Sequence, residues 1–341
     1  MKNPLLSLSG ADLIGIEIGN SGVRMASCRD GSARMAFARL PENLVADDHI
    51  ASPEMVSKFL KEMKSQYGFS GRRCAIILPE YSTFFRNLTM PPVNVGQLEL
   101  NLPFEFRDFT GDSSGNFNYD YAVENTNYNE EGEIESIDMV AAAAMKDVIN
   151  QYALVLRRAG FRLQLALPRE MALINLVRSN PNLEEDKEFA IVELGYNLSR
   201  VYIFKGTSIK ASRIIDAGCR DIDNAISGMF NIDTYIAASY RETNYQDVIS
   251  SEICKGIYNS ISLEIMKVMN FYRYENPDTA IEDVYFSGSG SSNSVLLQDI
   301  TNTIDLAGHP VTELIPLNID DEDLAAKCLM AIAVTMQKGG K

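Results

Sequence analysis

Two segments far apart in the chain repeat one pattern, and this repeat limits the possible folds more than any other feature. The sequence LIGIEIGN at 13–20 is matched, at a constant offset, by FAIVELGY at 189–196. Each segment is typical of a β-strand that ends in a turn and leads into second and third strands. The chain is therefore predicted to consist of two related halves, each beginning with a β-hairpin. The residues that match in pairs are Glu17 and Glu193, Gly19 and Gly195, and Arg24 and Arg200.

The tip of each predicted hairpin reads acid-x-Gly, a pattern that suits an anionic ligand. A glycine lets backbone N–H groups approach an anion closely, and the acid can hold a water molecule of a Mg²⁺ shell. A third glycine turn, at 287–291, follows a predicted strand at 284–286, where it could pass under a base or a ribose. Two such tips that face each other across a cleft would enclose a polyphosphate.

The composition excludes several classes of protein. A chain of 341 residues with 46% hydrophobic residues is long enough for about two packed domains. Its net charge of −15 repels phosphate backbones and anionic lipids, so we expect no nucleic-acid partner. No run of 18 apolar residues occurs, which predicts no direct insertion into a membrane. The five separated cysteines and two histidines give no zinc pattern and are typical of free thiols in a reducing cytoplasm.

Between the two hairpins, the segment 79–160 has a different texture, rich in tyrosine and asparagine, with its own apolar pattern. We interpret it as a small α/β insertion rather than a linker. Elsewhere, Ser52 followed by a proline predicts the start of a helix. The other predicted elements are strands at 116–124 and 135–142, a helix at 146–159, a mostly helical region at 220–273 and a terminal helix at 322–336.

The order of these features resembles the actin-like ATPase superfamily, an α/β (ribonuclease H-like) fold of two related halves. Within it, the chain is similar to the PilM family of type IV pilus assembly proteins, which is related to the cell-division protein FtsA. The similarity covers nearly the whole chain, although its individual motifs are degenerate. The segments that carry it are 13–25, 75–91, 98–109, 139–173 and 283–316.

The resemblance implies a division into four subdomains. The insertion at 79–160 would be subdomain 1C, and the helices at 221–280 would be subdomain 2B. The remaining segments are 10–78, 161–187 and 320–337 for subdomain 1A, and 188–220 and 281–319 for subdomain 2A.

The resemblance also implies a function. Family members bind ATP in the central cleft and bind the short cytoplasmic N-terminal tail of a PilN-like inner-membrane protein in a groove between 1A and 1C. The chain would then be a cytoplasmic scaffold of type IV pilus assembly, held by its partner at the inner face of the cell membrane. Homo-oligomers are also compatible with this family.

Carried over by position, the motifs place ATP and Mg²⁺ on the predicted tips. The first phosphate loop would contain Gly19, Asn20, Ser21 and Arg24, the second would contain Gly195, Asn197 and Ser199, and the turn near the base would contain Gly288, Ser289 and Gly290. The carboxylates that hold Mg²⁺ through water would be Glu17 and Glu193.

The sequence departs from the family pattern at the positions closest to the chemistry. Both tips carry glutamate where aspartate is usual, and the longer side chain would crowd the Mg²⁺ shell. Carboxylates with no metal role are an open alternative. In the 2B region the acid that contacts ribose is absent, and Arg241 stands in place of lysine. No catalytic residue can be assigned, although Glu170 lies nearest to the position of a water-orienting acid. We therefore expect slow ATP hydrolysis at most.

Two other functions were weighed against the scaffold. A small-molecule kinase of the same superfamily usually needs an intact Asp-x-Gly pair, which both tips lack. An FtsA-like protein that polymerises at the membrane usually ends in a basic amphipathic helix. The sequence after the predicted terminal helix, at 337–341, contains no such helix.

Overall fold

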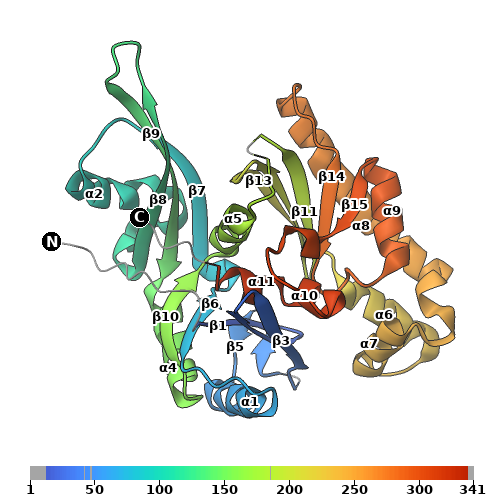
Figure 1. The fold of residues 1–341 in the computed structure, drawn as a ribbon. Coiled ribbons are helices and arrows are strands. Elements are labelled where there is room, and N and C mark those ends of the chain that lie inside the picture. The colour runs from blue at the N-terminus through green and yellow to red at the C-terminus, as the bar shows by residue number, and fades with distance from the viewer. Residues whose placement is uncertain (1–12, 42, 47, 185, 337–341) are drawn as a thin grey trace.

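The computed structural model describes residues 13–41, 43–46, 48–184 and 186–336, so residues 10–12 and 337 of the predicted subdomain 1A lie outside it. Two five-stranded sheets form the two halves, which confirms the predicted α/β fold (Figure 1). In the first sheet the strand order is β10-β6-β1-β2-β3. Its strands are β1 (Ile14–Gly19), β2 (Gly22–Arg29), β3 (Ser32–Arg39), β6 (Arg73–Ile77) and β10 (Arg162–Leu167).

The second sheet repeats this arrangement, with the order β13-β12-β11-β14-β15. Its strands are β11 (Glu188–Leu194), β12 (Ser199–Lys205), β13 (Ser208–Ile215), β14 (Asp283–Ser287) and β15 (Ala307–Pro310). In both sheets the opening three strands are antiparallel and the others are parallel to the first. Glu17 lies opposite Arg24 in the first hairpin, as Glu193 lies opposite Arg200 in the second. The repeat in the sequence is therefore a repeat in the structure.

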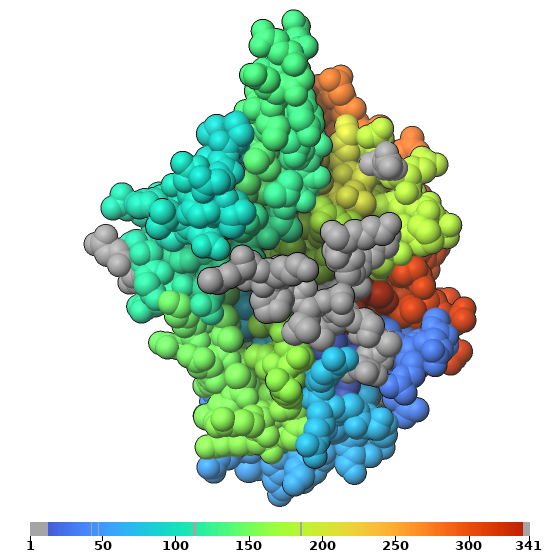
Figure 2. Space-filling view, turned by 60° about the vertical axis from the view of Figure 1, so that its left-hand side comes forward, coloured from blue at the N-terminus to red at the C-terminus, as the bar shows by residue number. Residues whose placement is uncertain are grey.

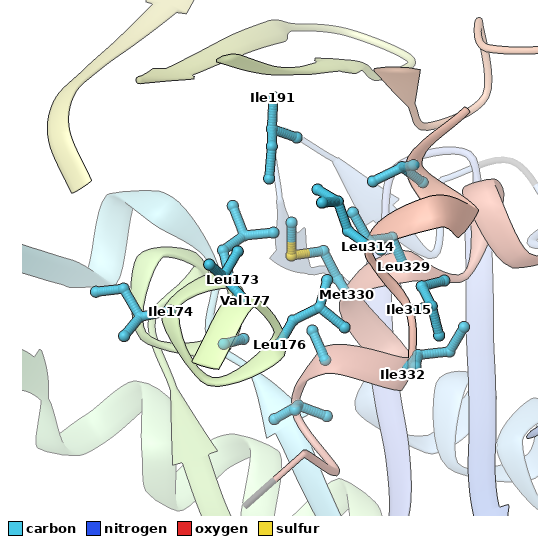
Figure 3. Packing of buried hydrophobic residues seen from close by; sticks show 14 of the residues in the cluster. Leu173, Ile174, Leu176, Val177, Ile191, Leu314, Ile315, Leu329, Met330 and Ile332 are labelled. Carbon is cyan, nitrogen blue, oxygen red and sulfur yellow. The ribbon is translucent and has the colours of Figure 1, made fainter. Parts of the chain in front are cut away.

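A buried cluster joins the two halves, and we call it the hinge core. Its centre is formed by α5 (Arg169–Ser179) and α11 (Leu329–Ala333), which lie between the two sheets (Figure 1). In Figure 3, Leu173 and Val177 of α5 point toward Met330 of α11, below Ile191 of the second sheet. These side chains are almost fully buried, so the hydrophobic effect holds the halves together here.

The predicted terminal helix at 322–336 is divided in two. It consists of α10 (Glu322–Lys327) and α11, which meet at Cys328. Helix α11 lies so close to β1 that a Cβ atom at Gly15 would sit 1.8 Å from the carbonyl oxygen of Ala331. Because a real Cβ never comes so near, this close contact between helix and strand requires glycine at that position.

The predicted boundary of the insertion at residue 160 needs a correction. Helix α4 (Lys146–Arg158) was assigned to the insertion, but its buried Val148, Tyr152 and Val155 pack in the cluster of the first sheet. There it contacts α1 (Pro53–Gln66), whose first residue follows Ser52 as predicted. The insertion therefore ends near residue 145. The two short strands β4 (Val45–Ala46) and β5 (His49–Ile50) complete this half.

The insertion itself is a three-stranded antiparallel sheet with one main helix. The order is β7-β9-β8, and the apolar side chains of α2 pack against one face of the sheet. The hairpin of β8 and β9 is longer than predicted, and Figure 2 shows it projecting from the molecule. The elements are β7 (Thr83–Met90), α2 (Val95–Glu105), α3 (Arg107–Thr110), β8 (Phe117–Tyr128) and β9 (Ile134–Met145).

Four helices pack with the second sheet around a third buried cluster. They are α6 (Cys219–Phe230), α7 (Thr234–Thr243), α8 (Glu252–Glu275) and α9 (Ser294–Ile304). Short 3₁₀ turns lie at Glu80–Ser82, Gly111–Asn116, Tyr245–Ser250 and Val311–Leu314. Among the described residues, no helix combines the length and the apolar character needed to cross a bilayer.

Candidate functional site

The two hairpin tips meet across a narrow cavity between the halves, which we call the tip cavity. Its volume is about 60 Å³, and residues of both tips line it. This volume holds a few water molecules. The predicted site residues that line it are Glu17, Gly19, Asn20, Ser21, Arg24, Glu193, Gly195, Asn197, Gly288 and Ser289.

Ser199 and Gly290 are the predicted site residues that do not line this cavity. The hydroxyl of Ser199 is buried and donates to the carbonyl of Ala217 at 2.8 Å. A Cβ at Gly290 would lie 2.8 Å from the Cβ of Leu194, so this glycine lets the late turn pack against the second hairpin. Both residues shape the tip without facing a ligand position.

Arg169, the first residue of α5, connects the two tips. Its Nη1 lies 2.9 Å from Oε1 of Glu193, and its Nη2 donates to Oε1 of Glu17. Both carboxylates are nearly inaccessible to solvent, at 5% for Glu17 and 7% for Glu193. Such charges are costly to bury unless they are paired, and here one guanidinium pairs with both. The ion pairs therefore join the first half to the second.

The matched arginines of the repeat extend this network across the cleft. Arg24 lies 3.6 Å from Glu17 and donates to the hydroxyl of Ser289 in the second half at 3.2 Å. Arg200 lies 4.0 Å from Glu193 and 2.6 Å from Glu80, which follows the first sheet. Each hairpin thus directs its arginine toward the opposite half.

These contacts determine the ionisation of the buried acid in the first tip. Burial raises the pKa of Glu17, but Arg169 and Arg24 outweigh burial and hold the pKa of this carboxyl below its usual value. Burial lowers the pKa of Arg169, and the neighbouring Glu193 and Glu17 more than reverse this effect, so its pKa lies above the usual value. Both groups are charged at neutral pH, as an ion-paired network requires.

The residues at the tips do not fit the predicted Mg²⁺ role. Both Glu17 and Glu193 are hydrogen-bonded by Arg169, so a metal-bound water would have to displace a guanidinium from a buried carboxylate. Within the described ranges, no three histidine, cysteine, aspartate or glutamate side chains gather closely enough to hold a metal ion. The tip cavity also has little room for a triphosphate. We therefore assign no step to a metal here.

Buried hydroxyl groups without partners mark the surroundings of the tips. Within the described part of the chain, Ser287 Oγ, Tyr202 OH and Tyr152 OH are buried and make no hydrogen bond to protein. Ser287 lines the tip cavity, where ordered water can satisfy it. Glu170 lies elsewhere: it lines a separate cavity of about 260 Å³ together with Tyr202, and burial raises its pKa.

A larger cavity, which we call the outer cavity, opens beside the tip cavity. It has a volume of about 350 Å³ and lies between β3 of the first half and α7 of the second. Arg39 of β3 and Glu242 of α7 form an ion pair of 2.7 Å at this cavity, which again links the halves. The residues that line both cavities are Asn20, Ser21, Tyr196, Asn197 and Ser289.

Arg241 of α7 also lines the outer cavity, and it is fixed from behind. Its guanidinium binds the carboxylate of Asp223 on α6 at 2.6 and 3.4 Å, and both residues are buried. Burial raises the pKa of Asp223, whereas the hydrogen bond from Arg241 lowers it. The arginine that replaces the family's lysine is therefore held in a single orientation.

Comparison with known proteins decides the family. A sequence profile described as "Type IV pilus assembly protein PilM" matches residues 15–321. The chain belongs to the PilM family.

Solved structures agree with this assignment. A structure titled "PilM-PilN type IV pilus biogenesis complex" superposes on the chain with a TM-score of 0.79 at 19% identity and covers 95% of this chain and 97% of that one. The ethanolamine utilization protein EutJ from Carboxydothermus hydrogenoformans gives a TM-score of 0.58 at 12% identity, covering 97% and 91%. At these identities the superpositions show the shared fold alone. A search among curated proteins finds no match.

Several residues of this PilM-family site were not predicted. Arg200 was within reach of sequence reasoning, because it matches Arg24 in the repeat. Arg39 and Arg220 line the outer cavity without any motif. Arg169 lies in a segment without a repeat, directly after Pro168, and nothing in its spacing indicates that it reaches both tips.

Proposed function

We propose that the chain is a scaffold of type IV pilus assembly that binds the N-terminal cytoplasmic tail of a PilN-like inner-membrane protein. The observation that carries this proposal is the family match over 15–321, and the similarity to a PilM structure solved with PilN supports it. The kinase and the FtsA-like protein are not favoured by this match. Binding through a partner would place the chain at the cytoplasmic face of the inner membrane.

The tail would bind where the insertion meets the first half, on the face turned forward in Figure 2. Among the described residues, β10 pairs with β6 alone and β8 pairs with β9 alone, so both are edge strands. An edge strand has unpaired N–H and C=O groups, which an extended tail can bind. On β8, Ala122 packs against the hinge core, and the exposed Asn118 and Asp120 share its side of the sheet.

The position of the insertion is fixed without a partner. Arg178 of α5 lies 2.6 Å from Glu124 of β8, and the side-chain amide of Asn87 in β7 donates to the carbonyl of Ile209 at 2.7 Å. A binding groove that is formed in advance needs less ordering when the tail arrives. We therefore expect the tail to bind with little movement of the insertion.

Exposed apolar side chains on α2 support a role in protein contacts. Val95, Leu100 and Phe104 are 61%, 71% and 66% exposed. Large apolar residues that gather on one surface are typical of interaction sites. Because α2 covers the opposite face of the insertion sheet, these residues provide a second place where a tail could bind, and the experiment must separate the two.

Titration of a synthetic PilN-type N-terminal peptide into the full chain by calorimetry tests the proposal. We expect saturable binding that Asp120→Arg weakens by about tenfold or more, because the edge of β8 changes its charge and shape. Glu130→Arg makes the same charge change at the exposed hairpin turn and serves as the matched control. Absence of heat at high peptide concentration would count against the proposal, and loss of binding in Leu100→Asp alone would move the site to α2.

Nucleotide binding by the chain stays a prediction, which the fold supports through the meeting of the two tips. The part of it that needs Mg²⁺ at Glu17 and Glu193 is not supported, because Arg169 binds both carboxylates. The proposed scaffold role does not depend on hydrolysis. The tail can bind at the insertion whether or not the cleft holds a nucleotide.

A further inference from the structure

We propose that the outer cavity binds a nucleoside diphosphate without a divalent metal, with arginine side chains in place of the metal ion. This inference goes beyond the proposed scaffold function and does not rest on it. The volume of about 350 Å³ falls in the range of small-molecule sites, which begins at about 300 Å³. The cavity joins the two halves, a common place for ligand sites.

The cavity gathers positive charge in a protein whose net charge is −15. Arg39, Arg220 and Arg241 line it, and Glu242 is the one acid among its described lining residues. Glu242 is neutralised by Arg39 at 2.7 Å. Within the described part of the chain, Arg220 makes no ion pair and is exposed, so its guanidinium is available to an anion.

The three guanidiniums lie around one point, which Tyr196 marks. Burial raises the pKa of the Tyr196 phenol, while Arg241, Arg39 and Arg220 act on this pKa in the opposite direction. Planar guanidinium groups bind phosphate oxygens with paired hydrogen bonds and need no bridging cation. A diphosphate beside Tyr196 would therefore meet a preformed positive field.

Aromatic side chains in the same cavity suit the base. The ring of Tyr235 lies beneath the guanidinium of Arg39, 5.2 Å from its centroid, and is 58% exposed. Phe37 and Ala238 add apolar surface to the lining. A flat base can stack on an exposed tyrosine ring, and an arginine above the ring strengthens such contacts.

The same geometry separates this site from one that needs a metal. The two acids that a Mg²⁺ shell would use in the tip cavity are both bound to Arg169. In the outer cavity the carboxylate of Glu242 is bound to Arg39. Divalent cations of this kind prefer free oxygen ligands, which these paired carboxylates do not offer. Binding should therefore be the same with Mg²⁺ and with a chelator.

Calorimetric titration of ADP into the full chain, once with Mg²⁺ and once with EDTA, tests the inference. We expect equal affinities in the two buffers. Arg220→Ala should weaken ADP binding by about tenfold or more, because it removes a charge-assisted hydrogen bond to phosphate. Tyr235→Leu should also weaken it, through loss of the stacking surface.

Arg213→Ala is the matched control, since Arg213 is an exposed arginine on β13 outside both cavities. It should leave ADP binding unchanged, and Arg220→Ala should leave binding of the PilN-type peptide unchanged. Three results would overturn the inference: no binding of ADP in either buffer, binding only with Mg²⁺, or equal losses in Arg220→Ala and Arg213→Ala.

Discussion

The two hairpins of the repeat have the same register but different partners. In the first, Arg24 reaches uncharged hydroxyls, including that of Ser289 in the second half. In the second, Arg200 forms a close ion pair with Glu80, at 2.6 Å. The repeat therefore fixes where each arginine starts, while the opposite half decides what it binds. Because Arg169 pairs with both acids, the cleft between the halves is neutralised by the protein's own side chains.

Removal of the shared arginine should break this comparison most strongly. In Arg169→Met the buried Glu17 and Glu193 lose their common partner and face each other as uncompensated charges. We expect a loss of about 3–5 kcal/mol in the free energy of unfolding, measured by urea denaturation. Arg178→Met removes a more exposed ion pair and should cost clearly less. Equal losses in the two variants would show that Arg169 has no special role.

The repeat position before the acids differs between the halves, and a substitution there sharpens the contrast. Gly15 lies under α11 in the first half, whereas the matching Ile191 fills the hinge core in the second. Gly15→Ala should force α11 away from β1 and cost about 1–3 kcal/mol, as overpacking does.

Thermal unfolding measures this effect, with Gly228→Ala as the control. A Cβ at Gly228, inside α6, would meet no atom within 4 Å. That change should stabilise the protein by up to about 1 kcal/mol, because alanine favours a helix. If both changes shifted the unfolding temperature in the same direction, the close contact at Gly15 would not be what requires glycine.

The smallest expected effect is on the pH dependence of stability. Glu17 has a pKa below the ordinary 4.5 in the folded protein, since Arg169 and Arg24 outweigh burial. A lowered carboxyl pKa contributes stability that is present above about pH 4.5 and is lost as the pH falls through the folded value. The free energy of unfolding should therefore fall less steeply below pH 4.5 in Glu17→Gln than in the parent chain. In Glu99→Gln, which changes an exposed glutamate of α2, the slope should match the parent.

The sequence predicted the parts of the fold that local pattern controls. The strands, the turns and the pairing of Glu17 with Glu193 follow from one repeat, because hairpins are specified by neighbouring residues. The position of α4 did not follow, since the spacing of its apolar residues shows that one face is buried but not which sheet covers it. The extra length of β8 and β9 was missed because their outer residues are polar on both faces.

The site shows the same division. Ten positions at the tips could be placed because they belong to the repeated turns. The neutralisation of their acids could not be predicted, because Arg169 lies more than a hundred residues from either end of the first hairpin and carries no motif. The cluster of Arg39, Arg220 and Arg241 depends on three separate elements meeting, which only the folded chain shows.

The location of Arg169 on α5 has a mechanical consequence. The helix that carries it is packed in the hinge core, while its first side chain holds an acid from each sheet. Any rotation of one half against the other must therefore strain the helix and break a buried charge contact at the same time. The molecule behaves as a rigid spacer, and an assembly built around it would receive a component of constant width.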